Sequence, residues 1–140
     1  MVDGDRLLYG GAEIGYGYKN ERQNVLMQNK KIICEATALQ NPEAVQNSKG
    51  LVGDGAVYLC AFRTVKEYQG KGYFSKLMQF MLDDLREKGF TRATLGVEPA
   101  EEINKKIYAH YGFTEYVKRA EETYPDGTVI TVDYFAKRLG

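Results

Sequence analysis

This sequence has no excess of charge of either sign. Its 19 Lys and Arg residues balance its 19 Asp and Glu residues, so the formal net charge is zero. A balanced chain argues against a non-specific nucleic-acid binder and against a polybasic membrane binder, since both need many surplus cations. We therefore expect neither nucleic acid nor membrane as a partner, and any anion site must be local.

Cysteine and histidine are scarce as well. Cys34 and Cys60 lie in apolar, strand-like runs without Cys-x-x-Cys spacing or a histidine partner. This pattern favours buried, reduced thiols over redox or metal chemistry, so no metal site is expected. The single histidine, His110, falls in the last turn of an expected helix, where its charge complements the helix dipole better than it suggests catalysis.

Long apolar runs and a signal-peptide pattern are also absent from the sequence. Together with the reduced cysteines, these absences predict a soluble, cytoplasmic protein. Residues 1–140 are expected to form a single domain that buries roughly two thirds of the surface of the unfolded chain. No internal repeat or linker divides it.

Hydrophobic patterning predicts an α/β to α+β fold. Residues 6–18 predict one strand and residues 31–39 a second, followed by a loop or short helical turn at residues 41–55. The run Ala56–Phe62 is apolar at successive positions, which is typical of a central strand covered on both faces. Residues 93–97 predict the next strand.

Two helices are expected between and after these central strands. The first begins after Gly72 and ends before Gly89, with a full apolar stripe made by Phe74, Leu77, Met78, Met81, Leu82 and Leu85. A right-handed crossover through it would set strand 93–97 parallel to strand 56–62.

The second helix starts near Pro99. Its expected apolar face and C-terminal cap are Ile103, Ile107, Tyr111, Gly112 and Phe113. A hairpin of residues 116–123 and 128–137 closes the chain around the turn at residues 124–127.

The glycine turn ahead of the first helix is the best candidate for an anion site. Gly70 and Gly72 let several N–H groups point one way at a helix N-terminus, and Lys71 adds a charge. Two glycines often serve only a tight turn, so the turn alone is weak evidence. It is not a P-loop, because no Gly-Lys-Ser or Gly-Lys-Thr follows. It is not a dinucleotide-binding fingerprint either, because Phe74 stands near the position of the third small residue.

The order of these parts resembles the GCN5-related N-acetyltransferase (GNAT) family. The family's phosphate turn is Gln or Arg, two residues, Gly, one residue, and Gly or Ala. Here Gln69 and Gly72 match, while Phe74 departs from the last position. The family's later Tyr, three residues, Gly-Phe pattern is met by Tyr108, Gly112 and Phe113. The similarity covers the C-terminal part of the chain, from about Ala56 onward.

This resemblance implies a mixed, mostly antiparallel sheet with a central parallel βαβ unit and a C-terminal hairpin. It also implies acetyl-CoA as acyl donor, with no metal. The family's N-terminal helices are expected to be reduced or absent. Either that region is strand-like or the chain lacks an N-terminal piece.

The implied cofactor site has three parts. Backbone N–H groups from Gln69 to Phe74 would hold the pyrophosphate, the strand edge at residues 62–65 would read the pantetheine amides, and Tyr108 would lie near the sulfur. The implied cofactor-binding residues are Phe62, Arg63, Thr64, Val65, Gln69, Gly70, Lys71, Gly72, Tyr73, Phe74, Ser75 and Tyr108. Asn104 is a further cofactor-binding candidate, because it lies one helical turn before Tyr108 on the same face, although the family more often has its asparagine at the position of Glu101.

The catalytic candidates are Tyr108, as proton donor to the leaving thiolate, and two carboxylates. Glu35 on strand 31–39 and Glu98 at the end of the βαβ unit lie where such sheets present ligands, so either could take the amine's proton. A solvent-exposed role for each carboxylate, a water chain as the base and a core role for Tyr108 all stay open.

The sequence therefore predicts an N-acetyltransferase that moves an acetyl group from acetyl-CoA to a primary amine, by direct transfer in a ternary complex. The acceptor would be a small-molecule or peptide amine, and a homodimer is among the assemblies that the sequence allows. The alternatives are a non-catalytic acyl-CoA-binding or sensing module, and a plain interaction domain.

Overall fold

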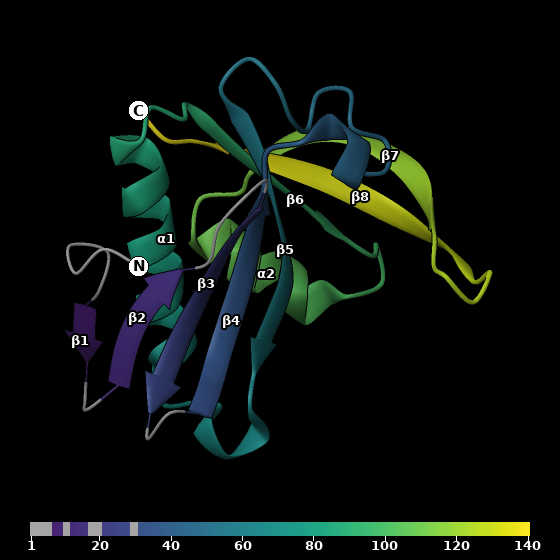
Figure 1. Cartoon of the computed structure of the whole chain (residues 1–140). Coiled ribbons are helices and arrows are strands. Elements are labelled where there is room, and N and C mark those ends of the chain that lie inside the picture. Colours follow the sequence, from purple (N-terminus) through teal and green to yellow (C-terminus); the bar gives the residue numbers. More distant parts are fainter. Residues whose placement is uncertain (1–6, 10–11, 17–20, 29–30) are drawn as a thin grey trace.

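A computed structural model describes residues 7–9, 12–16, 21–28 and 31–140 (Figure 1). Its elements are β1 (Leu7–Tyr9), β2 (Ala12–Tyr16), β3 (Glu21–Gln28), β4 (Lys31–Leu39), the 3-10 helix η2 (Pro42–Ala44), β5 (Ala56–Thr64), the 3-10 helix η3 (Lys66–Tyr68), α1 (Tyr73–Glu87), β6 (Arg92–Val97), α2 (Glu102–His110), β7 (Glu115–Thr123) and β8 (Val129–Arg138). In these described segments, no helix is long and apolar enough to cross a membrane.

One sheet joins all the described strands. Its eight strands run in the order β1-β2-β3-β4-β5-β6-β8-β7. Every neighbouring pair is antiparallel except β5 and β6, which are parallel and connected through α1. The predicted fold class is therefore confirmed: a mostly antiparallel sheet with a central parallel βαβ unit and a C-terminal hairpin.

The N-terminal region was predicted less well. The single strand expected at residues 6–18 is wrong, because β1 and β2 pair antiparallel with Tyr9 opposite Ala12. The sequence Gly10-Gly11 separates these two partners, and a two-residue Gly-Gly connection is a hairpin signal. β3, which the sequence reading did not identify, then pairs with β4. The strand-like N-terminal third is thereby confirmed in the described segments.

The elements around the predicted βαβ unit agree closely with expectation. β4 has the predicted bounds, β5 extends two residues beyond Phe62, and β6 begins one residue before Ala93. Phe90 donates its N–H to the carbonyl of Leu85, and Gly89, at φ 95°, donates to that of Arg86. This paired hydrogen-bond pattern with a left-handed glycine is the Schellman motif that ends α1.

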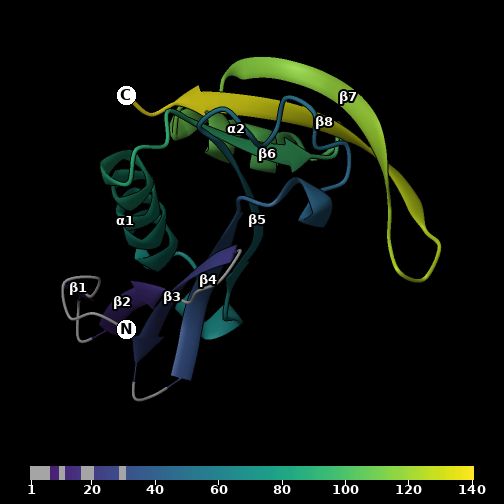
Figure 2. The same cartoon turned by 45° about the horizontal axis from the view of Figure 1, so that its top comes forward.

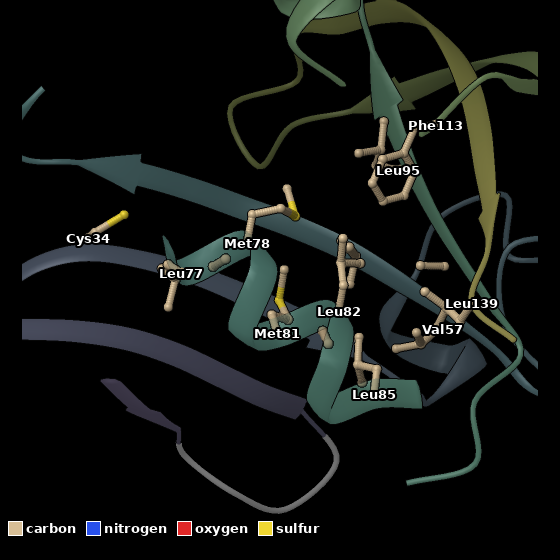
Figure 3. Close-up of a cluster of buried hydrophobic side chains, with 14 of the residues drawn as sticks. Cys34, Val57, Leu77, Met78, Met81, Leu82, Leu85, Leu95, Phe113 and Leu139 are labelled. Atoms are coloured by element: carbon tan, nitrogen blue, oxygen red, sulfur yellow. The ribbon is translucent and has the colours of Figure 1, made fainter. Parts of the chain in front are cut away.

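The helical stripe of α1 forms the centre of the core. Leu77, Met78, Met81, Leu82 and Leu85 are buried against Cys34, Val57, Leu95, Phe113 and Leu139 (Figure 3). Full burial of each such apolar side chain stabilises the fold by about 1.5–3 kcal/mol. This packing holds α1, which follows the glycine turn, against the sheet.

Alternating residues of β5 reach two separate core clusters. Val57 and Leu59 belong to the cluster under α1, whereas Tyr58 and Cys60 pack with Tyr134 on the other side. The expectation that this strand is covered on both faces is confirmed for its first half. Cys34 is buried and Cys60 half-buried, and both are free thiols.

The expected apolar face of α2 is confirmed for Tyr111 and wrong for Ile103. Ile103 is 76% exposed and Ile107 40% exposed, whereas Tyr108 and Tyr111 pack against the core. Asn104 lies one turn before Tyr108 and is also half-buried. The inner side of α2 carries polar groups because it lines a cavity.

Candidate functional site

The sheet separates between its two parallel strands. β5 and β6 pair only from Ala56 opposite Arg92 to Tyr58 opposite Thr94. Beyond this point β5 stays with β4 as far as Thr64, while β6 stays with β8 as far as Val97, and the two ribbons diverge in Figures 1 and 2. The edge of β5 beyond Tyr58 is thus left without a β6 partner.

A β-bulge bends β5 just after the separation. Cys60 lies opposite Thr37 and Arg63 opposite Glu35, so Ala61 and Phe62 together face the single residue Ala36. Ala61 has a φ of 55°, in the left-handed region. An extra residue in a strand shifts the side on which later side chains point. The bulge therefore turns Phe62 toward the α1 and α2 side, where it contacts the first core cluster.

A cavity of about 580 Å³ lies at this separation, between β5, the glycine turn, the start of α1 and the inner side of α2. Most residues predicted to bind the cofactor line it: Phe62, Arg63, Thr64, Gln69, Gly70, Gly72, Tyr73, Phe74, Ser75, Asn104 and Tyr108. Val65 and Lys71 are not among the lining residues. The structure thus brings the strand end, the turn and the second helix to one cavity, and their roles in binding stay predictions.

The glycine turn is held against the end of β5. Gln69 donates from Nε2 to the carbonyl oxygen of Thr64 over 3.1 Å. Gly70 and Gly72 have φ values of 75° and 85°, which a side chain would strain. Gly72 is the N-cap residue of α1 and has no side chain with which to cap it. The positive end of the α1 dipole is therefore directed to the cavity wall.

Aromatic rings make the floor of the cavity. Phe74 packs edge-on against Phe62 at 5.7 Å and against Tyr111 at 6.0 Å, between ring centroids. Phe74, the departure from the family's turn pattern, is therefore part of an aromatic wall while still beginning the helical stripe. Lys71 lies outside this wall, with its Nζ atom 5.9 Å from the ring centroid of Tyr68.

Tyr108 lines the cavity from α2, with its ring against that of Phe62. Desolvation by burial, followed by the charge of Glu101, raises the pKa of its phenol above the ordinary value. The phenol is therefore protonated at neutral pH. The end of α2 is fixed because Phe113 donates its N–H to the carbonyl of Tyr108, with Gly112 at φ 101°. The predicted Gly-Phe cap is confirmed, and it sets the orientation of the last turn.

Asn104 and Glu101 are joined next to this tyrosine. Asn104 donates from Nδ2 to Oε2 of Glu101 over 2.8 Å. Glu101 is the N-cap residue of α2, but its side chain makes no capping bond to the helix backbone. Sequence reasoning named Asn104 as a site residue and gave Glu101 no role in the site, although its position at the head of a helix close to the predicted Glu98 was a usable signal.

The two predicted carboxylates lie apart. Glu35 on β4 accepts a 2.8 Å hydrogen bond from Nε of Arg63 and a second from its Nη2 atom, so it forms an ion pair across the two strands. Glu98 lines a second, smaller cavity of about 150 Å³, together with Tyr58, Glu101 and Glu122. Neither Glu35 nor Glu98 lines the larger cavity.

Three lining residues of the larger cavity were not predicted: Tyr68, Ile107 and Tyr111. Ile107 and Tyr111 were both assigned to the apolar face of α2, so both were seen as packing residues. A third cavity, of about 360 Å³, shares Ser75 and Tyr111 with the larger one. Lys137 and Arg138 also line it, which gives this side of the molecule a basic character.

The larger cavity fits the parts of acetyl-CoA that the sequence reading assigned to it. A Cβ added at Gly70 would meet no atom within 4 Å, so the backbone of the turn faces open space. A helix N-terminus, an unpaired strand edge and an aromatic wall match a pyrophosphate, a pair of amides and an apolar arm, respectively. In the described segments, no cluster of three or more His, Cys, Asp or Glu side chains is placed to hold a metal ion.

Comparisons with known proteins agree with this architecture. The profile of the acetyltransferase (GNAT) family matches residues 13–113. N-alpha-acetyltransferase 30 of Schizosaccharomyces pombe is 35% identical over 71 residues, which are 51% of this chain and 47% of that protein. The chain thus spans about half the length of this relative.

Solved structures share the fold at low sequence identity. The ribosomal-protein-S18-alanine N-acetyltransferase of Escherichia coli superposes with a TM-score of 0.67 at 18% identity, covering 89% of this chain and 72% of that one. A protein of Salmonella typhimurium, solved with its cofactor acetyl-CoA, gives a TM-score of 0.62 at 16% identity, covering 86% and 65%. Since the family profile spans most of the sequence, this chain belongs to the acetyltransferase (GNAT) family.

Proposed function

We propose that this protein is an N-acetyltransferase that transfers an acetyl group from acetyl-CoA to a primary amine, directly and within a ternary complex. One observation carries the proposal. The cavity where β5 and β6 separate has the N-terminus of α1 on one wall and the phenol of Tyr108 on the other. This arrangement supplies an anion site and a proton donor in one space.

The turn and the strand edge would hold the donor. The backbone around Gly70 and Gly72 would bind the pyrophosphate, and the edge of β5 beyond Tyr58 would bond the pantetheine amides as an added strand does. The basic cavity beside Ser75 and Tyr111 would take the 3′-phosphate through Lys137 and Arg138. The structural relative that was solved with acetyl-CoA supports this donor.

Tyr108 would act in the transfer step. When bound, acetyl-CoA supplies an activated thioester, and the enzyme then needs mainly to orient an amine and to protonate the leaving sulfur. The phenol remains protonated at neutral pH because its pKa is raised. It can therefore donate a proton to the departing thiolate.

Direct transfer is favoured over an acyl-enzyme. Desolvation by burial raises the pKa of the Cys34 thiol, and its Sγ atom lies 3.2 Å from Oγ1 of Thr64. A buried thiol with a raised pKa is a poor nucleophile. Neither Cys34 nor Cys60 lines the larger cavity.

The experiment measures donor binding and turnover separately. Acetyl-CoA should raise the melting temperature of the purified protein, and addition of an amine should release free CoA thiol. The amines are spermidine, tyramine and a peptide with a free N-terminal alanine. The peptide is included because one relative is named an N-alpha-acetyltransferase and another a ribosomal-protein-S18-alanine N-acetyltransferase. A melting shift without thiol release would favour a binding or sensing module, and absence of both would contradict the proposal.

A further inference from the structure

Glu101 links the two cavities near the separation of β5 and β6. It lines the smaller cavity, and its Oε2 atom accepts the 2.8 Å hydrogen bond from Asn104, which lines the larger one. Its charge also acts on the phenol of Tyr108. Of the carboxylates in the described segments, Glu101 is the one with these links to both cavities.

The smaller cavity approaches the separation from the opposite side of the sheet. Tyr58, the last β5 residue paired with β6, belongs to the second core cluster, whereas Phe62 in the larger cavity belongs to the first. Gly96 and Val97, at the end of β6 that has no β5 partner, line the smaller cavity. An acceptor in the smaller cavity and a donor in the larger one would therefore meet near Glu101 and Tyr108.

The groups that face Glu101 come from several elements. Glu98 precedes it in the loop after β6, Tyr58 faces it from β5, and Glu122 and Tyr124 face it from β7 and the turn that follows. Glu122 is held in place, because Tyr134 donates a 2.5 Å hydrogen bond to its Oε2 atom. No basic side chain is found among the described residues that line this cavity. An ammonium group would be attracted here, and an anionic acceptor would be repelled.

An alkyl amine with a pKa of about 10.4 is protonated at neutral pH and must lose a proton before it can attack. Glu98 lines the smaller cavity but makes no described contact with Asn104 or Tyr108. Glu35 lines neither cavity and is paired with Arg63. Glu101 lines the smaller cavity and is hydrogen-bonded to Asn104 of the larger one.

We propose that the acceptor is a cationic amine that enters through the smaller cavity, and that Glu101 takes the proton from its ammonium group. This inference rests on the proposed acetyl transfer. The neutral nitrogen then forms its bond to the acetyl carbon as the carbon–sulfur bond breaks. Tyr108 donates a proton to the sulfur and regains one from the new amide nitrogen, while the proton on Glu101 passes to solvent.

The test compares the wild type with Glu101→Gln and Glu98→Gln, and uses Glu102→Gln as the matched control. Glu102 is adjacent, but it pairs with Lys105 and lines neither cavity. Activity is measured as kcat/KM from pH 6 to 10 with whichever of spermidine, tyramine and the alanine peptide the wild type uses best.

Glu101→Gln should lower kcat/KM at pH 7 by roughly 10²-fold, the typical effect of losing a general base. The loss should shrink as the pH rises toward the pKa of the amine, because more acceptor is then already neutral. The dissociation constant for acetyl-CoA and the activity of Glu102→Gln should stay at wild-type values. A merely structural role would lower activity equally at every pH.

Two results would overturn the role of Glu101 while leaving acetyl transfer intact. One is a wild-type pH profile in Glu101→Gln, and the other is the expected loss appearing in Glu98→Gln instead. If the wild type itself releases no thiol with these amines, the proposed transfer fails, and the role of Glu101 fails with it. The activity of the wild type thus distinguishes failure of the proposed acetyl transfer from failure of the proposed role of Glu101.

Discussion

The ring of Phe62 on β5 lies 5.5 Å from the ring of Tyr108 on α2, between centroids. The first residue follows the bulge in the central strand, and the second lies on the helix that follows β6. Their contact joins the two diverging halves of the sheet across the larger cavity. It also buries part of the phenol, which is the larger cause of the raised pKa of Tyr108.

Tyr108→Phe should separate chemistry from binding. Removing the hydroxyl deletes the proton donor but leaves the ring packed against Phe62, so turnover should fall by about 10²-fold. The dissociation constant for acetyl-CoA should change little. Because the pKa of Tyr108 is raised above about 10, the wild type should show no alkaline loss from this group below that pH.

Steady-state kinetics with calorimetric binding checks this prediction. Tyr111→Phe is the matched control, since Tyr111 also lines the cavity and packs against Phe74. If Tyr108→Phe turned over at the wild-type rate, Tyr108 would have no part in the reaction.

Gly72→Val should weaken the donor site itself. A β-branched residue at φ 85° strains the backbone by about 1–2 kcal/mol and displaces the N–H groups at the start of α1. We expect the dissociation constant for CoA, measured by calorimetry, to rise at least about tenfold, an energy of about 1.4 kcal/mol.

The control for this variant is Gly127→Val in the β7–β8 turn. Gly127 has a φ of 90°, and an added Cβ would meet no atom within 4 Å. It therefore carries similar backbone strain far from the turn at Gly72. Equal loss of CoA affinity in both variants would show that the effect reflects general destabilisation.

Local patterns made much of this fold predictable. The stripe of α1, the glycine caps at Gly89 and Gly112, and the hairpin turn each depend on residues close together in sequence. For that reason their positions agree with the structure within a residue or two. The family's turn pattern, with the strand edge and the tyrosine that the resemblance implied, named most of the residues that line the larger cavity, and their roles in binding stay predictions.

The rest depends on partners far apart in sequence. The bulge at Ala61 exists only relative to β4, because two residues there face Ala36. Periodicity put Ile103 and Ile107 in the core, yet Ile103 is 76% exposed and Ile107 lines the larger cavity, because the inner side of α2 faces that cavity. Glu101 becomes part of the smaller cavity only through residues of β6, β7 and β8, which are far from one another in sequence.

Removal of the basic side chains at the end of β8 should identify the phosphate that they contact. Lys137→Ala with Arg138→Ala should raise the dissociation constant for CoA by about tenfold, since charge-assisted contacts to a phosphate contribute roughly 1.5–3 kcal/mol. The affinity for dephospho-CoA, which lacks the 3′-phosphate, should not change. Calorimetry with both ligands provides the comparison, and equal weakening for both would place the 3′-phosphate elsewhere.

The conformation of Ala61 gives a prediction about stability. Ala61 is exposed and has a φ of 55°, so its methyl group gains no packing and is strained by about 1 kcal/mol. Ala61→Gly relieves that strain but adds freedom to the unfolded chain, which costs about 0.5–1 kcal/mol. The free energy of unfolding should therefore stay within about 1 kcal/mol of the wild type.

Ala61→Val should behave differently, because a β-branched residue is a true outlier in the left-handed region. We expect it to lower the free energy of unfolding by at least about 2 kcal/mol, measured by urea titration. Because the bulge turns Phe62 into the larger cavity, the surviving folded protein should also bind acetyl-CoA more weakly than Ala61→Gly does. If valine and glycine gave equal stability and equal affinity, β5 would tolerate a regular register, and the bulge would not be what shapes the donor cavity.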